Sequence, residues 1–135
     1  MPYLEWNEDL SVGVKQLDDQ HKVLITTVNE LHRAMAKGQG RTITASLLKT
    51  LVTYTREHFA CEESLMRQSA FPEAADHKHL HDELTGQVQD YVKRFEDGEI
   101  SLSVDLLQFL DQWLVKHIKG SDRKYGPWMN RQGIS

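Results

Sequence analysis

Histidine is the unusual residue of this 135-residue chain, because five of its seven histidines combine with two carboxylates at helical spacings. Imidazole and carboxylate groups together suit transition metals such as iron or manganese. Seven ligands are too many for one tetrahedral zinc, which takes four. Two metals that share bridging carboxylates would use the whole candidate set, which comprises His21, His58, Glu62, His77, His81, His117 and Asp122.

Two pairs of candidate ligands have the spacing of one helical turn. His58 and Glu62 are four residues apart, and so are His77 and His81. A four-residue step places two side chains on the same helical face, where a single metal can take both. The spacing therefore predicts two pairs of ligands, each supplied by one helix.

The last pair has a different spacing. Asp122 follows His117 by five residues, a step that swings off the face of a regular α-helix. Gly120 and Ser121 lie between the two and permit the helix to loosen. We therefore expect a loosened turn that lets Asp122 fold back across the end of the protein.

Four amphipathic helices are predicted to position these residues, because apolar residues and histidines recur at spacings of three and four. Their predicted ranges are 18–38, 42–68, 73–98 and 107–120. Short connections favour antiparallel neighbours, so the predicted fold class is all-α, an antiparallel up-down-up-down four-helix bundle. An irregular N-terminal segment precedes the bundle, and a short irregular C-terminal extension, 123–135, follows it and packs through Trp128.

In such a bundle the candidate ligands all lie at the same end. They fall at the starts of the first and third helices and at the ends of the second and fourth. Burying these polar groups without partners would cost several kcal/mol each, and a metal satisfies them best. A single buried histidine is more often a hydrogen-bonded core residue, but five at one level of four helices favour metal ligands.

Two histidines serve as internal controls. His32 lies on nearly the same face as His21 but about 16 Å further along the helix axis, too far to share a metal. His79 points away from the line that joins His77 and His81, so we expect it on the surface. Both are predicted not to bind metal.

Composition excludes several other classes of function. Sixteen Lys and Arg against twenty Asp and Glu give a net charge of -4 without a basic run, so nucleic acid is not an expected partner. The N-terminus lacks the basic start and apolar stretch of a signal peptide, and no apolar run predicts membrane insertion. Cys61 has no second cysteine to pair with. We expect one domain over 1–135, located in the cytoplasm.

The sequence resembles the hemerythrin family over essentially its whole length. Four segments carry the resemblance, and they are specific as a set. They are WNEDLSVGVKQLDDQH ending at His21, HFACE from His58 to Glu62, HKHLH from His77 to His81, and HIKGSD from His117 to Asp122.

The resemblance implies a cofactor of two iron ions joined by an oxo or hydroxo bridge. It assigns three histidines to one iron and His21 with His58 to the other, with Glu62 and Asp122 bridging the pair. The three histidines of the first iron are His77, His81 and His117. The implied function is reversible binding of molecular oxygen at the second iron, where oxygen is held as a hydroperoxide without net reaction.

The resemblance also indicates the surroundings of the irons. Leu24, Trp113, Leu114 and Ile118 occupy places that resemble the family's apolar oxygen pocket, a role compatible with ordinary core packing. Tyr125 is expected either to hydrogen-bond to a ligand or to lie on the surface.

Three classes of function remain open from the sequence. The first is an oxygen-binding protein for storage, delivery or sensing, which is not an enzyme beyond a weak oxidase or peroxidase side activity. The second is a di-iron enzyme that reduces peroxide or nitric oxide. The third is a signalling module. The Glu-x-x-His pairs of oxygen-activating di-iron bundles are absent from the sequence, which favours the first class. We expect a monomer, with an oxygen-consuming enzyme as a candidate partner.

Overall fold

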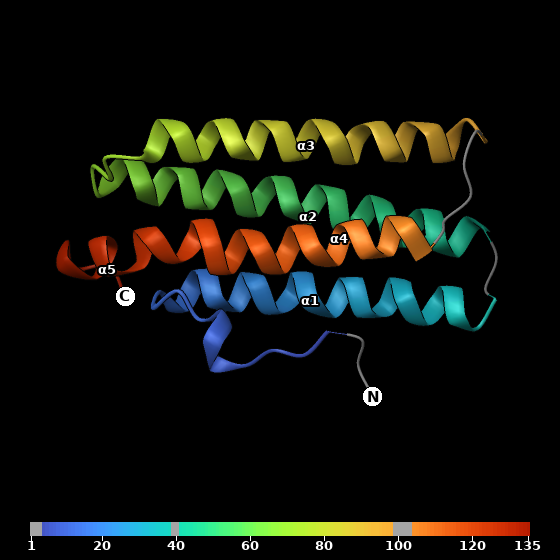
Figure 1. The fold of residues 1–135 in the computed structure, drawn as a ribbon, viewed down its shortest axis with the longest axis horizontal. Helices are drawn as coiled ribbons and strands as arrows, with labels where there is room; N and C mark the ends of the chain where they lie inside the picture. Colours follow the sequence, from blue (N-terminus) through green and yellow to red (C-terminus); the bar gives the residue numbers. More distant parts are fainter. Residues whose placement is uncertain (1–3, 39–40, 99–103) are drawn as a thin grey trace.

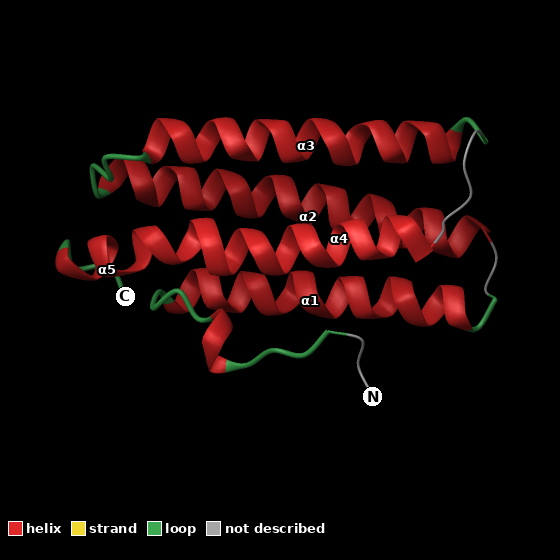
Figure 2. Cartoon of the chain, viewed as in Figure 1, coloured by secondary structure: helices red, strands yellow, loops and turns green. Residues whose placement is uncertain are grey.

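The computed structural model describes residues 4–38, 41–98 and 104–135, and Figure 1 shows four long helices that run side by side. They are α1 (Lys15–Ala36), α2 (Arg41–Gln68), α3 (Ala74–Glu96) and α4 (Val104–Lys116). The described part of the chain contains helices and loops but no strand (Figure 2). The predicted all-α four-helix bundle is confirmed. Thr42 and Leu107, with which the second and fourth predicted helices begin, are among the residues whose side chains the structure does not describe.

Glycine and a tight turn end the helices near the predicted positions. Gly38 and Gly98 follow α1 and α3 with φ of 66° and 78°, the left-handed conformation that commonly stops a helix. The turn between α2 and α3 includes Ala70, whose φ is 56°. These stops keep the connections short, and consecutive helices consequently run in opposite directions.

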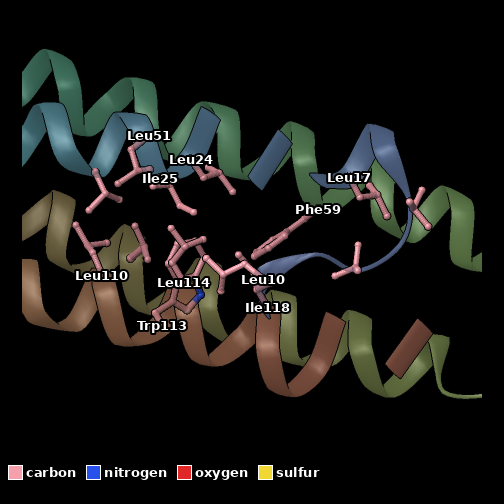
Figure 3. Packing of buried hydrophobic residues seen from close by; sticks show 14 of the residues in the cluster. Leu10, Leu17, Leu24, Ile25, Leu51, Phe59, Leu110, Trp113, Leu114 and Ile118 are labelled. Carbon is pink, nitrogen blue, oxygen red and sulfur yellow. The ribbon is translucent and has the colours of Figure 1, made fainter. Parts of the chain in front are cut away.

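Apolar side chains from all four helices fill the bundle, and the close-up in Figure 3 shows some of those from α1, α2 and α4. Leu17, Val28 and Leu31 of α1 have no exposed surface. Leu51 of α2 and Leu110 of α4 are 1 % exposed. Burial of one such side chain stabilises the fold by about 1.5 to 3 kcal/mol.

The N-terminal segment is anchored against the start of α1. After the short 3-10 helix η1 (Glu8–Leu10), the Asp18 carboxylate accepts hydrogen bonds from Ser11 Oγ at 2.6 Å and from the Val12 amide at 2.8 Å. Asp18 lies in the first turn of α1, where a negative charge also favours the exposed amides of the helix start. The segment is thereby fixed to the end of the bundle that carries the candidate ligands.

The predictions for the C-terminal region were partly wrong. The helical backbone does not end at Gly120, and most of 123–135 is helical instead of an irregular extension. Instead α4 passes into the π-helix η2 (His117–Asp122) and then into α5 (Arg123–Arg131), which includes Pro127. Gly126 and Pro127 are poor helix formers, but tertiary contacts override that preference.

Two of these contacts hold α5 across the end of the bundle. Trp128 Nε1 donates to the Ser69 carbonyl at 2.7 Å, and Asn130 Nδ2 donates to the Gly13 carbonyl at 2.9 Å. A Cβ atom at Gly126 would lie 2.0 Å from the Val12 carbonyl oxygen, so only glycine permits this approach.

None of the described helices combines the length and apolar character needed to cross a membrane.

Candidate metal centre

The structure brings the seven predicted ligands together at one end of the bundle. Helix α1 supplies His21, α2 supplies His58 and Glu62, α3 supplies His77 and His81, and η2 supplies His117 and Asp122. All seven are buried, and none is more than 6 % exposed. The two pairs spaced four residues apart lie on single faces of α2 and α3, as the spacing predicted.

The π-helix explains how His117 and Asp122 meet. Its hydrogen bonds join residues five apart, so a five-residue step returns to the same face, and His117 Nε2 lies 3.0 Å from Asp122 Oδ1. Nothing lies within 4 Å of a Cβ built at Gly120, so the wide turn does not depend on a close approach there. The loosened turn expected from the sequence is therefore present, in the form of a π-helix.

The ligand atoms form two groups that share one residue. One group consists of His77, His81, His117 and Asp122, and the other of His21, His58, Glu62 and Asp122. Within each group the candidate atoms lie within 4.8 Å of one another. We call these the three-histidine group and the two-histidine group.

The two carboxylates lie between the groups in different ways. Asp122 turns Oδ1 toward His77 Nε2, at 3.0 Å, and Oδ2 toward His21 Nε2, at 3.1 Å. Each oxygen of Asp122 therefore faces one group, as a bridging ligand requires. Glu62 turns Oε1 toward His58 Nε2, at 2.7 Å, and the same oxygen lies 3.9 Å from His81 Nε2.

The unpaired polar atoms at the centre fit bound cations. Six buried atoms that point into the two groups approach one another within 3.1 Å but form no hydrogen bond: Nε2 of His21, His58 and His77, Oε1 of Glu62, and both carboxylate oxygens of Asp122. Leaving such atoms unpaired in the interior is costly. Metal ions that accept nitrogen and oxygen ligands would satisfy all of them.

The electrostatics keep two central ligands in forms that bind metal. Burial, reinforced by His117 and His77, lowers the pKa of His81 to about 2, so its imidazole is neutral. Burial alone would raise the pKa of Asp122. The contacts of its carboxylate with His117, His21 and His77 nevertheless hold this pKa well below the usual value of an aspartate. A neutral imidazole and an ionised carboxylate are the states that coordinate a metal.

Tyr125 of α5 contacts a residue of each ligand group, Glu62 and His77. It is fully buried, and its hydroxyl donates a 2.6 Å hydrogen bond to Glu62 Oε2. Of the two positions considered from the sequence, the structure places the residue next to a candidate ligand and not at the surface. This bond leaves Glu62 Oε1 directed at the two groups.

Three residues around the centre were missed by the sequence reasoning. Gln20 Oε1 lies 2.6 Å from His58 Nδ1, Glu63 Oε2 lies 3.3 Å from His81 Nδ1, and the Phe59 ring stacks on His81 with centroids 3.7 Å apart. Each of the three is the sequence neighbour of a candidate ligand. Gln20 neighbours His21 in the sequence but contacts His58, so adjacency in the sequence did not indicate which ligand each residue touches.

The predicted pocket residues are all buried beside the centre. Leu24 of α1 and Leu114 of α4 are 1 % and 2 % exposed, and Trp113 and Ile118 are also buried. Figure 3 shows them among the apolar side chains between the helices. All four residues belong to the apolar core, and their role as an oxygen pocket stays a prediction.

The remaining polar candidates lie apart from the two groups. The His79 side chain is 75 % exposed and lies 3.0 Å from Glu83. His32 is half-buried further along α1 and belongs to neither group. Cys61 is half-buried, and its sulfur accepts a 3.4 Å hydrogen bond from Gln16.

The fold and the paired ligand groups define a class of protein, the four-helix bundles whose end holds a two-metal centre. Comparison with known proteins narrows this class. Residues 12–129 match the family model described as Hemerythrin HHE cation binding domain. The chain belongs to the hemerythrin family.

Individual relatives agree over most of their length. The chain is 38 % identical to a bacteriohemerythrin of Stenotrophomonas maltophilia, over 93 % of this chain and 80 % of that protein. It is 35 % identical to a bacteriohemerythrin of Methylococcus capsulatus, over 96 % of this chain and 99 % of that protein. A crystal structure of wild-type hemerythrin superimposes with a TM-score of 0.89 at 35 % identity, covering 94 % of this chain and 98 % of the other.

Proposed function

We propose that this protein binds molecular oxygen reversibly at a di-iron centre. The observation that carries the proposal is the pair of buried ligand groups that share Asp122, in a member of the hemerythrin family. His77, His81 and His117 would hold one iron and His21 and His58 the other, with Glu62 and Asp122 between them. When bound, a ferrous pair supplies the two electrons that oxygen takes up and returns.

The protein's own side chains perform three tasks in this proposal. Asp122 fixes the separation of the two groups, because each of its oxygens faces one of them. Tyr125 holds Glu62 by its hydroxyl, so that the other carboxylate oxygen stays directed at the centre. The buried residues Leu24, Trp113, Leu114 and Ile118 exclude water, which favours release of oxygen over its reduction.

Several finer expectations belong to the same proposal. We infer that the protein acts as an oxygen carrier and not as an enzyme, with any oxidase or peroxidase activity weak. We also infer an oxo or hydroxo bridge between the irons, a monomeric state, a cytoplasmic location and an oxygen-consuming enzyme as partner. The histidine-rich ligand set supports the carrier role, since it lacks the Glu-x-x-His pairs of oxygen-activating bundles.

Metal analysis combined with absorption spectra tests the proposal. We expect about two irons per chain, because the seven ligands, two of them shared carboxylates, divide between two sites of octahedral type. The reduced protein should gain an absorption band in air and lose it on removal of oxygen, over several cycles. One iron per chain, or zinc alone after growth in iron-rich medium, would contradict the proposal. Rapid turnover of added peroxide or nitric oxide would favour the enzyme instead.

A further inference from the structure

One histidine in each ligand group has a polar side chain next to its outer ring nitrogen, and the two side chains differ in charge. On the two-histidine side, Nδ1 of His58 lies 2.6 Å from the amide oxygen of Gln20. On the three-histidine side, Nδ1 of His81 lies 3.3 Å from a carboxylate oxygen of Glu63. One histidine therefore faces a neutral acceptor and the other an acidic one.

The direction of these hydrogen bonds follows from the opposite ring nitrogen. His58 turns Nε2 toward Glu62 Oε1, at 2.7 Å, and His81 turns Nε2 toward His117 Nε2, at 3.0 Å. A histidine whose Nε2 coordinates a metal carries its proton on Nδ1, so Nδ1 is the donor. Gln20 and Glu63 are consequently the acceptors.

A positive charge lies near the other oxygen of Glu63, too far away for a hydrogen bond. Lys78 Nζ lies 4.0 Å from Glu63 Oε1 and is itself held by Asp82 at 2.9 Å. The Glu63 side chain is only 15 % exposed, so water screens its contact with His81 weakly. The Phe59 ring covers one face of the His81 imidazole with an interplanar angle of 2°. The stacked Phe59 ring therefore restrains the plane of the His81 imidazole, and the contact with Glu63 restrains the direction of its Nδ1.

We propose that Glu63 is a positioning residue that makes the three-histidine iron the harder of the two to reduce, while Gln20 leaves the two-histidine iron easier to reduce. A carboxylate acceptor draws the Nδ1 proton more strongly than an amide does and raises the basicity of the coordinated imidazole. A more basic ligand stabilises ferric iron over ferrous iron. The inference rests on the proposed di-iron function and adds an asymmetry between its two metals.

The test exchanges the two acceptors in the full, iron-loaded protein. The variants are Glu63→Gln, Gln20→Glu and the double variant with both changes. Glu83→Gln is the matched control, because Glu83 is an exposed acid that contacts only the exposed His79 among the histidines of α3. The readouts are iron content and the two one-electron reduction potentials, followed by absorption during a redox titration.

Each variant has a distinct expected result. Glu63→Gln should raise mainly the lower reduction potential, that of the three-histidine iron. Gln20→Glu should lower mainly the higher potential, that of the two-histidine iron. Both changes reduce the difference between the two reduction potentials. The double variant should narrow it most while leaving the sum of the potentials near that of the parent. Glu83→Gln should change neither. Glu63→Ala, which removes the acceptor altogether, should weaken iron binding by about 10- to 100-fold.

The outcomes separate this inference from the function on which it rests. A parent protein without about two irons or without a reversible oxygen spectrum would overturn the proposed function. A normal parent whose potentials stay unchanged in Glu63→Gln and Gln20→Glu would overturn the asymmetry alone. Equal movement of both steps in each variant would also overturn it, because a distant charge acts on both irons alike.

Discussion

The two halves of the bundle differ in what their cores contain, apolar side chains in one and polar side chains in the other. We call the part around the candidate ligands the metal half, and the part around Leu31, Leu48, Leu51, Phe95 and Leu110 the distal half. The core of the distal half is apolar and satisfied by its own contacts. The core of the metal half holds buried nitrogen and oxygen atoms that lack hydrogen-bond partners. The difference indicates that the distal half packs without needing polar partners, whereas the polar atoms at the centre of the metal half would be satisfied by bound cations.

The sharpest test of this contrast replaces ligands with alanine. His77→Ala should remove iron or leave a damaged site, because it deletes a buried ligand that faces Asp122 at 3.0 Å. His79→Ala, two residues further along α3, should keep about two irons per chain, since the His79 side chain is 75 % exposed. Iron content measured on both purified proteins decides between them. An equal loss from both would show that the assignment of helix faces is wrong.

A pair of buried leucines extends the comparison to stability. Leu51 lies in the distal half and Leu114 beside the metal half, and they are 1 % and 2 % exposed. Truncation of either to alanine should lower the free energy of unfolding by about 2 to 5 kcal/mol, unless the cavity collapses. Denaturant unfolding of the two variants measures this loss. A cost well below this range at either position would mean that its surroundings repack.

The same pair should differ in the lifetime of the oxygenated protein. A gap at Leu114 lies next to the polar centre and admits water, which shortens the oxygenated state and leaves both irons oxidised. Leu114→Ala should therefore lose its oxygenated absorption band in air faster than the parent, at matched iron content. Leu51→Ala should decay at the rate of the parent. Equal rates in all three proteins would mean that Leu114 packs the core without guarding the site.

Much of the metal half was predictable because its residues follow short-range rules. The four-residue steps placed His58 with Glu62 and His77 with His81 on single faces. The five-residue step from His117 required a loosened turn, which the structure forms as a π-helix. These relations depend on helix geometry alone and need no knowledge of the surroundings.

The features that were missed depend on contacts between distant segments. Helix α5 forms despite Gly126 and Pro127, because the Val12 carbonyl approaches Gly126 and because Trp128 bonds to the turn after α2. The Gln20 contact with His58 crosses from α1 to α2, and its existence depends on how the two helices pack. Local periodicity carries no information about such approaches.

The smallest expected effect concerns a single oxygen atom in the metal half. Tyr125→Phe removes the hydroxyl that donates to Glu62 Oε2 at 2.6 Å but keeps the ring, which packs against Phe71 and His77. Burial, together with the charges of Asp122 and Glu62, holds the pKa of Tyr125 well above that of a free tyrosine. The hydroxyl is therefore a donor at any physiological pH, and Glu62 would lose a charge-assisted hydrogen bond worth about 1.5 to 3 kcal/mol.

Unfolding of the iron-loaded Tyr125→Phe protein should show a loss of this size while about two irons per chain remain, because the candidate metal ligands themselves are intact. The control is Tyr91→Phe, which deletes the hydroxyl of a half-buried tyrosine whose ring lies tilted against Phe109 in the distal half. This control should lower the free energy of unfolding by no more than about 0.5 kcal/mol, as is usual for substitutions outside the packed core and buried hydrogen-bond networks. Equal costs at the two positions would mean that the bond to Glu62 contributes nothing particular to the metal half. Loss of iron from Tyr125→Phe would mean that Glu62 cannot act as a ligand without this bond, whereas retained iron would mean that the bond orients a carboxylate that the metals also hold.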